Sequence, residues 1–407
     1  MSFITASTPG RQTMIKAPKI LVVDDEPDLE VLIRQRFRKQ IRDDELRFEF
    51  AQNGVQALQK LEEHRDITMI LSDINMPEMD GLTLLEKVAE RNNPALKSVI
   101  VSAYGDMENI RTAMNRGAFD FLTKPIDFGD LELTMRKTMQ QLEVIAGALM
   151  VRDQLVAVQR DLTTASSIQQ SLLPKTFPPF PDRPEVDVFA RMLTAKEVGG
   201  DFYDFYFVDD DRLAFAVGDV SGKGIPAAIY MAVSRTLLKA IAHQVADPGE
   251  VLARLNRLLI PESDAHTFVT VFFGVLNVRT GEVQYGSGGH NPPYVVRAGG
   301  AVEKLPMCDG ALLGKILKVD FETKRLQLAP GDAMFLYTDG VSDAMDADMN
   351  MYEESRLEAY LRGAAGSSIV DLAQGSIADL KKHTRDATQS DDITVLTLRY
   401  AGTNGRH

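Results

Sequence analysis

The segment KILVVDD, residues 19–25, decides the fold of the first half of the chain. A short apolar run that ends in two aspartates is typical of a buried parallel strand. Similar runs follow it, and segments of helix length separate them, so the sequence predicts a doubly wound α/β domain whose parallel sheet is covered on both faces. The predicted strands are KILVV (19–23), RFEFA (47–51), TMILS (68–72), SVIVS (98–102) and FDFL (119–122), and the predicted helices span 28–39, 54–63, 81–91 and 106–116.

Polar residues end these apolar runs. Asp24 and Asp25 follow the first, Asp73 the third, Ser102 ends the fourth and Lys124 follows the fifth. Because the carboxyl ends of parallel strands meet at one edge of a sheet, we expect these side chains to lie together. Clustered carboxylates repel one another unless a cation shares them, and Mg²⁺ fits such a set. An aspartate there can accept a phosphoryl group as an acyl phosphate, while the lysine and the metal neutralise the developing charge.

Each of these aspartates alone could be a simple helix cap, but that explanation does not account for the whole set in this order. The segment closely resembles the receiver domains of response regulators. The resemblance implies a flavodoxin-like fold with a phosphorylated aspartate. It is carried by the motifs VVDDEPDL (22–29), DINMPEMDG (73–81), VSAYGD (101–106) and FLTKP (121–125).

The resemblance assigns a role to each polar residue of the first domain. It implies that Asp73 is the phosphoacceptor and that Asp24 and Asp25, together with Asp73, hold Mg²⁺. It implies that Ser102 and Lys124 sense the phosphoryl group. Phe121 stands where the family has its rotating aromatic residue, and an ordinary core phenylalanine is the alternative.

A long helix is predicted between the two halves of the chain, because residues 128–173 contain no strong breaker apart from Gly147. Its apolar residues form a narrow seam, as in a coiled coil, with one interruption of the register. The helix should end near Pro174, before a proline-rich hinge at 175–184. The helix is either a passive spacer or a parallel dimer rod that transmits a change. The seam consists of Leu142, Ile145, Leu149, Leu155, Val158, Leu162 and Ala165.

The second half shows paired strand-like runs rather than strand–helix alternation. This pattern predicts an α+β domain, an antiparallel β-sandwich flanked by helices at 225–244, 248–260 and 367–383. Acidic motifs recur at the strand ends over almost the whole domain. Hard carboxylate ligands of this kind select Mg²⁺ or Mn²⁺, and two such ions about 4 Å apart can activate water for attack on a phosphoryl group. The motifs are EVGGDFYD (197–204), VGDVSGKG (217–224), YTDGVSDA (337–344) and QSDDITVL (389–396).

Any single aspartate before glycine is usually a turn residue, but four such motifs favour a shared site. From Ala165 to Tyr400 the chain resembles the PPM (protein phosphatase 2C-like) serine/threonine phosphatases of the bacterial SpoIIE and RsbU subgroup. The motifs that carry this resemblance are the four above together with SIQQSLLP (167–174), GDVSGKGIPAA (218–228), FVTVFFG (268–274) and GHNPP (289–293).

The resemblance also implies a metal site with two ions, Mg²⁺ or Mn²⁺. In it Asp219 bridges the ions, the carbonyl of Val220 completes one of them, Asp339 and Asp391 bind the other, and Asp201 orients metal-bound water. These four aspartates are the expected catalytic residues.

Some positions of this site stay open. Asp392 is the alternative to Asp391, although the alignment of the turn favours Asp391. Asp343 stands where the subgroup more often has Glu, and more distant relatives use an Asp there with a third ion. Lys223 has no assigned role, and a structural role is favoured for His290.

The length of 407 residues suggests two or three domains. The net charge of −13 disfavours nucleic acid and anionic membranes as partners, and the single Cys308 excludes an internal disulfide. No signal peptide is evident, so we expect a cytoplasmic protein.

The predicted parts are a flexible terminus (1–18), the receiver domain (19–130), a coiled-coil linker (131–174), the phosphatase domain (175–400) and a flexible tail (401–407).

These features together predict a phosphorylation-regulated response regulator that hydrolyses phosphoserine or phosphothreonine on a protein. By resemblance, its partners are a histidine kinase or phosphotransfer protein and a phosphorylated STAS-domain anti-sigma-factor antagonist in a partner-switching pathway, and it forms a homodimer through the linker. One alternative is a phosphorylation-gated adaptor with an inactive phosphatase fold. Another is a phosphatase domain that acts on the aspartyl phosphate of its own receiver.

Overall fold

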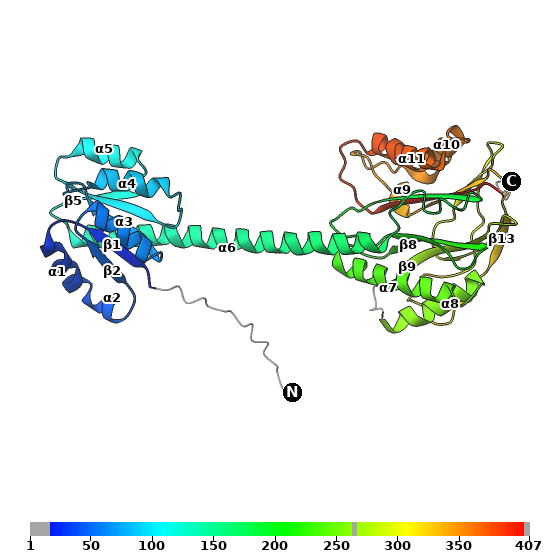
Figure 1. The fold of residues 1–407 in the computed structure, drawn as a ribbon, viewed down its shortest axis with the longest axis horizontal. Coiled ribbons are helices and arrows are strands. Elements are labelled where there is room, and N and C mark those ends of the chain that lie inside the picture. Colours follow the sequence, from blue (N-terminus) through cyan, green and yellow to red (C-terminus); the bar gives the residue numbers. More distant parts are fainter. Residues whose placement is uncertain (1–16, 263–266, 403–407) are drawn as a thin grey trace, which may run out of the picture. The chain divides into compact units, whose positions relative to one another are not determined.

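The computed structural model describes residues 17–262 and 267–402 (Figure 1). The chain separates into two compact units, which divide between Ala157 and Val158. The flexible ends predicted at 1–18 and 401–407 lie almost wholly outside the described residues, and the domain boundaries stay predictions.

The first unit contains a parallel sheet of five strands in the order β2-β1-β3-β4-β5. Its order confirms the doubly wound fold predicted from the sequence. The strands are β1 (Lys19–Val23), β2 (Arg47–Ala51), β3 (Ile67–Asp73), β4 (Lys97–Ala103) and β5 (Asp120–Lys124).

Helices cover both faces of this sheet (Figure 1). Ile33 of the first helix packs on one face, and Ala57 and Leu84 of later helices pack on the other. The single helix predicted at 28–39 is wrong in one respect, because Phe37 leaves the helical conformation and divides it into two. The helices are α1 (Pro27–Arg36), α2 (Arg38–Arg42), α3 (Gly54–Glu63), α4 (Gly81–Glu90) and α5 (Met107–Asn115).

The predicted long helix is confirmed as α6 (Phe128–Leu172), which is continuous over 45 residues. Its first turns belong to the core of the first unit, where Leu131 and Met135 are buried. Its last turns lie in the second unit, where Gln169 is buried. Between these ends most side chains of the helix are exposed.

The second unit contains two antiparallel sheets of five strands each. Apolar residues of both sheets, such as Phe215, Leu336 and Leu396, form one large core between them, which confirms the predicted sandwich. One sheet contains β13 (Lys324–Gln327), β10 (Glu282–Gly288), β9 (Val269–Asn277), β8 (Arg212–Val220) and β7 (Phe202–Phe207), and the other contains β12 (Val302–Lys304), β11 (Tyr294–Val296), β14 (Ala333–Tyr337), β15 (Ile393–Tyr400) and β6 (Val186–Leu193).

Helices cover the outer faces of this sandwich (Figure 1). The pair α7 and α8 packs on the sheet of β8, and α10 and α11 pack on the sheet of β15. Among the described helices, α7 alone is long and apolar enough to cross a membrane, but it packs against β7 and β8 as a core helix does. The helices are α7 (Ile225–Ala242), α8 (Pro248–Leu259), the 3₁₀ turn η1 (Ile260–Glu262), α9 (Asp339–Ser342), α10 (Glu353–Gly363) and α11 (Ile369–Thr384).

Candidate functional site

An acidic cluster lies at the carboxyl edge of the parallel sheet. Ligand atoms of Asp24, Asp25 and Asp73 all lie within 4.8 Å of one another, and the described residues contain no second group of three that is as close. Asp24 and Asp73 are buried and Asp25 is exposed. They meet because β1 and β3 are neighbouring strands that end at the same level. Oxygen ligands at this spacing suit Mg²⁺, which keeps part of its water shell.

Lys124 lies beside this cluster, as predicted. Its Nζ is 2.7 Å from Oδ2 of Asp73 and 3.1 Å from Oδ2 of Asp24. Burial by itself would lower the pKa of Lys124, but hydrogen bonds and charges from the two aspartates outweigh burial and raise it. The ammonium group therefore stays charged next to the expected phosphoacceptor.

The two other predicted switch residues, Ser102 and Phe121, differ from each other in burial. Ser102 is buried at the end of β4, the strand next to Asp73, and its Oγ is 3.4 Å from Oδ2 of Asp106. Phe121 on β5 is 38% exposed, so it is not an ordinary core phenylalanine in this structure.

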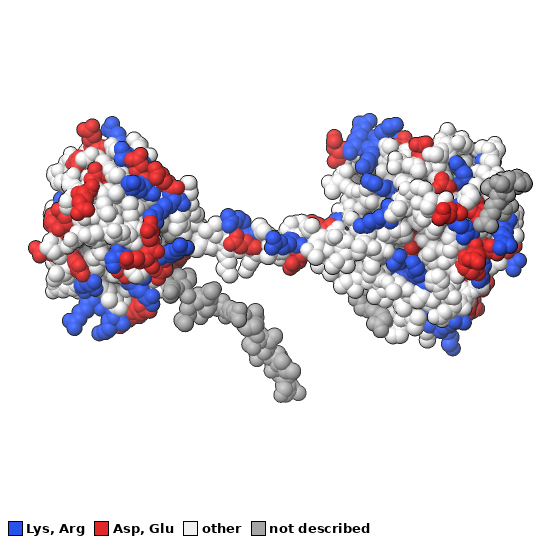
Figure 2. Space-filling model, viewed as in Figure 1, with Lys and Arg blue, Asp and Glu red and all other residues white. Residues whose placement is uncertain are grey.

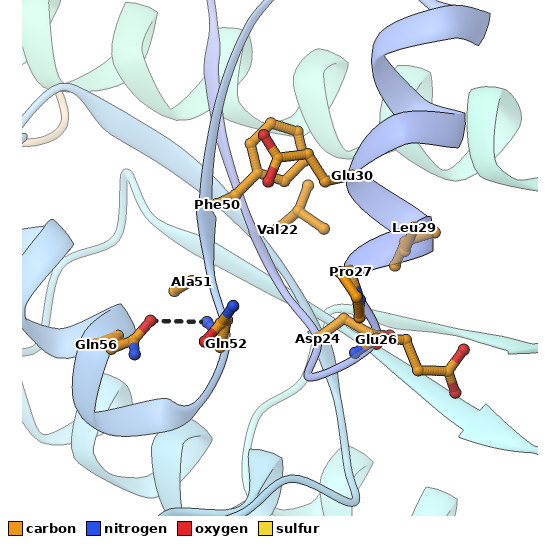
Figure 3. Close-up of a pocket in the computed structure, with 10 residues that line it drawn as sticks. All are labelled: Val22, Asp24, Glu26, Pro27, Leu29, Glu30, Phe50, Ala51, Gln52 and Gln56. Atoms are coloured by element: carbon orange, nitrogen blue, oxygen red, sulfur yellow. Dashed lines mark hydrogen bonds between the residues drawn. The ribbon is translucent and has the colours of Figure 1, made fainter.

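A cavity of about 200 Å³ adjoins the acidic cluster (Figure 3). Asp24, Glu26 and Pro27 border it at the start of α1, and Gln52 borders it at the end of β2. The backbone N–H of Gln52 donates a hydrogen bond to Oε1 of Gln56 across 3.0 Å. Of the three clustered aspartates, Asp24 alone lines this cavity.

Both sheets of the second unit contribute aspartates to a second acidic region. Asp201 precedes β7 and Asp219 lies at the end of β8, whereas Asp339 follows β14 and Asp391 precedes β15. The loop after β14 packs tightly against the loop before β15. There is no room for a side chain at Gly340, since a Cβ at this position would lie 1.8 Å from the carbonyl oxygen of Asp392. Residues almost 200 positions apart also meet, because the N–H of Gly200 donates a hydrogen bond to Oδ2 of Asp392 at 2.7 Å.

The proximity of these carboxylates changes their ionisation. Burial raises the pKa of Asp201 well above its usual value, and the charge of Asp219 adds to this effect. Burial, helped by the charge of Asp339, raises the pKa of Asp219 to about 7. Burial and the charge of Asp391 also raise the pKa of Asp339. Such crowding is costly unless cations lie among the carboxylates, so the donor set fits divalent ions.

This region differs from the receiver cluster in its spacing. Within the described part of the chain, the ligand atoms of Asp219, Asp339 and Asp391 do not all lie within 4.8 Å of one another.

Two threonines fix the orientation of Asp201. Its Oδ2 accepts hydrogen bonds from Oγ1 of Thr338 at 2.7 Å and from Oγ1 of Thr394 at 2.6 Å. Both threonines come from the opposite sheet, next to Asp339 and within the DITVL motif. Sequence reasoning missed them, although their positions beside the acidic residues were a usable signal.

The contacts of Asp391 and Asp392 distinguish these neighbours. Oδ1 of Asp392 accepts the N–H of Ala195 at 2.7 Å, and its Oδ2 accepts the N–H of Gly200 at 2.7 Å. Asp392 therefore braces the 195–201 loop, whereas Asp391 is half-exposed and its Oδ2 lies 3.1 Å from Nζ of Lys223. This arrangement favours Asp391 as the metal ligand, and it gives Lys223 a partner that the sequence did not predict.

The remaining predicted ligands lie nearby. Oδ1 of Asp343 accepts a hydrogen bond from Oγ of Ser342 at 2.8 Å, and its charge contributes to the raised pKa of Asp339. Val220 is buried. Its carbonyl oxygen lies close to Gly200, because a Cβ at Gly200 would be only 2.6 Å from that oxygen.

His290 joins the two sheets behind the acidic region. Its Nδ1 is 2.8 Å from Oγ1 of Thr270, the β9 residue paired with Asp219, and its Nε2 is 3.1 Å from the carbonyl oxygen of Tyr337. Burial lowers its pKa to about 4. The neutral ring can therefore accept from the threonine and donate to Tyr337, which supports the structural role favoured from the sequence.

The linker helix reaches the same region through Gln169. Its Nε2 donates to the carbonyl oxygen of Gly199 at 2.6 Å, and its Oε1 accepts the N–H of Gly199 at 3.1 Å. The next residue, Gly200, is the one whose N–H binds Asp392. The side chain of one helix residue thus holds the loop that precedes Asp201.

Comparisons with known proteins agree with this architecture. Residues 20–136 match the model for the response regulator receiver domain, and residues 209–401 match the model for stage II sporulation protein E (SpoIIE). The chain is 27% identical to phosphoserine phosphatase RsbU of Bacillus subtilis over 242 residues, which are 60% of this chain and 70% of RsbU. It is 28% identical to protein IcfG of Synechocystis over 268 residues, which are 58% of this chain but only 41% of IcfG.

A solved structure shows the same fold. The SiaA-PP2C domain of Pseudomonas aeruginosa superposes with a TM-score of 0.54 at 24% identity, over 60% of this chain and 98% of that domain. The family matches define a chain with a receiver domain and a PPM-type phosphatase domain. The chain belongs to the response regulators, and its second domain is of the SpoIIE type.

The depressed pKa of His290 gives a stability prediction. The unfolded chain binds this proton at about pH 6.5 and the folded chain only near pH 4, so stability is full above pH 6.5 and declines as the pH falls towards 4. Relative to a His290→Gln variant, wild type should lose roughly 3 kcal/mol across this window. Urea unfolding of both proteins at several pH values measures this loss, and a difference that is independent of pH would contradict it.

Proposed function

We propose that this chain is a divalent-metal-dependent phosphatase that hydrolyses phosphoserine or phosphothreonine on a protein and is controlled by phosphorylation of Asp73. The observation that carries the proposal is the meeting of Asp201, Asp219, Asp339 and Asp391 from two sheets, with the pKa of the first three raised. The similarity to a phosphoserine phosphatase supports the substrate class.

The residues suit hydrolysis of a phosphate monoester. Asp219, Asp339 and Asp391, with the carbonyl of Val220, would hold two ions, Mg²⁺ or Mn²⁺, which when bound supply an activated water and neutralise phosphoryl charge. Asp201, fixed by two threonine hydroxyls, would orient the attacking water. The oxygen of the attacking water would bond to phosphorus while the bond from phosphorus to the seryl oxygen breaks. One proton of that water would pass to the seryl oxygen and the other would stay with the phosphate, which leaves serine and inorganic phosphate.

The proposed partners follow from the same two domains. A histidine kinase or phosphotransfer protein would phosphorylate Asp73 with Mg²⁺ held by Asp24 and Asp25, and Lys124 would neutralise the added charge. The proposed substrate is a phosphorylated STAS-domain anti-sigma-factor antagonist in a partner-switching pathway. We place the protein in the cytoplasm, where such signalling partners occur.

Gln169 offers a route by which the receiver could control the metal site. Both polar atoms of its side chain bind Gly199, and the adjoining residues Gly200 and Asp201 lead to Asp392 and to the catalytic region. A rotation or shift of α6 would pull on this loop. Phosphorylation would then change the affinity for the metal rather than the chemistry itself.

The same helix supports a homodimer. Val144, Val151, Leu155 and Val158 are each more than half exposed, and their spacing of seven, four and three residues places them on one side of α6. This exposed seam differs from the predicted one, because Val144 and Val151 replace Leu142, Ile145 and Leu149, which are only partly exposed. It continues without a break through Leu155 and Val158 to Leu162, so it lacks the interruption of the predicted seam. A parallel second copy of the helix would cover it.

Loss of a central metal ligand should abolish hydrolysis. With Mn²⁺, Asp219→Asn should release phosphate from a phosphoserine protein at least about a hundredfold more slowly than wild type, because a group that stabilises the transition state is lost. Asp210→Asn is the matched control, since Asp210 is exposed in the same unit. Equal rates for wild type and Asp219→Asn would refute the proposed mechanism.

Removal of the Gln169 side chain should uncouple the two domains. In Gln169→Ala the N–H and carbonyl groups of buried Gly199 lose their hydrogen-bond partners, at a cost of about 1–3 kcal/mol. The loop before Asp201 is then held less firmly, so this variant should need roughly tenfold more Mn²⁺ for half-maximal activity. Its response to a beryllofluoride adduct at Asp73 should shrink below about twofold. Exposed Gln170→Ala is the control, and identical behaviour of the two variants would contradict the route.

The exposed seam gives a test of the dimer. Light scattering should give about twice the mass of one chain, and Leu155→Glu combined with Val158→Glu should give the mass of one chain, because charges in the seam repel. Val156→Glu changes an equally exposed residue off the seam and should leave the dimer intact. A wild-type chain that is monomeric with and without the beryllofluoride adduct would exclude the dimer.

A further inference from the structure

A cavity of about 240 Å³ lies directly beside the acidic region of the second unit. Gly340 and Asp391, which adjoin or belong to the proposed metal ligands, form one side of it. Buried residues form its floor, among them Ala344, Leu380 and Ile393. The cavity is therefore a recess with an apolar floor and polar residues such as Thr384 and Gln389 around it, and Asp391 belongs both to its lining and to the proposed catalytic site.

The size of the recess limits what it can hold. Pockets for small organic ligands usually measure roughly 300–1,000 Å³, so this one is better matched to a single amino-acid side chain. An occupant that reaches both the recess and the metal site must carry a phosphoryl group and an apolar group a few ångströms apart. A phosphorylated polypeptide segment with an apolar residue beside its phosphoserine meets this requirement.

Two of the three charged residues that border the recess are cationic, although the chain as a whole is acidic. Lys381 and Arg385 border it at the end of α11, and both are exposed. Within the described residues, neither side chain forms an ion pair with an acidic group. Figure 2 shows Lys and Arg side chains gathered over this end of the second unit, although the whole chain has a net charge of −13. These cations complement acidic groups on an incoming segment.

We propose that this recess is a substrate subsite that receives an apolar side chain next to the phosphorylated residue, while Lys381 and Arg385 bind acidic side chains that flank it. The proposal rests on the proposed phosphatase activity and adds a sequence preference to it. The recess lies on the path of the substrate chain, so its occupation holds the phosphoserine against the metal site.

Synthetic peptides test this preference on the full-length chain with Mn²⁺ at physiological salt, which limits long-range charge effects. One peptide has leucine on both sides of phosphoserine and glutamates beyond. A second has glycine in place of leucine, and a third has lysine in place of glutamate. The first peptide should have a kcat/KM at least tenfold above the other two, mainly through a lower KM, and p-nitrophenyl phosphate serves as a probe without flanking residues.

Variants connect this preference to the recess. Arg385→Glu should lower kcat/KM for the acidic peptide about tenfold more than it lowers that for p-nitrophenyl phosphate. Lys382→Glu makes the same change of charge three residues away, at an exposed position outside the recess, and should leave both values within twofold of wild type. Ala387→Phe, which fills the recess, should remove the advantage of leucine over glycine, and its thermal unfolding checks that it folds.

The outcomes separate the subsite from the activity. If the chain hydrolyses p-nitrophenyl phosphate but hydrolyses the three peptides at equal rates, or hydrolyses none of them, the subsite is overturned and the phosphatase function stands. Equal effects of Arg385→Glu and Lys382→Glu would overturn the subsite as well. Absence of all hydrolysis by the wild-type chain with Mn²⁺ would instead overturn the proposed phosphatase function, and the subsite with it.

Discussion

The repulsion between buried carboxylates is the constraint on which the second unit depends. Its two sheets bring Asp201, Asp219 and Asp339 out of water and next to one another, and the pKa of each is raised as a result. A fold selected for stability alone would not bury this charge. Divalent cations among the carboxylates, as proposed above, would balance this charge.

The surrounding structure holds these carboxylates in place without neutralising them. Thr338 and Thr394 orient Asp201, Asp392 braces the loop that carries it, and His290 ties the two sheets together behind it. All these contacts are hydrogen bonds from neutral donors, which fix the geometry and leave most of the negative charge in place. Lys223, with its Nζ 3.1 Å from Asp391, only partly opposes the raised pKa of Asp339. Gln169 joins the same loop from α6, which places the linker helix one residue away from the catalytic scaffold.

The sequence predicted the features that depend on local pattern. The parallel sheet and the long helix followed from apolar periodicity, and Asp24, Asp25 and Asp73 followed from their positions at strand ends. Contacts between distant segments could not be derived in this way. The role of Asp392 as a brace depends on the loop at 195–201, and the division of the first helix at Phe37 depends on how its ring packs in the core.

Anomalous X-ray diffraction from crystals of the full chain grown with Mn²⁺ tests the central claim most directly. The account predicts two anomalous peaks in the second unit, about 4 Å apart, with oxygens of Asp219 shared between them and with Asp339 and Asp391 as further ligands. Well-ordered aspartates in that region with no anomalous peak among them would contradict it.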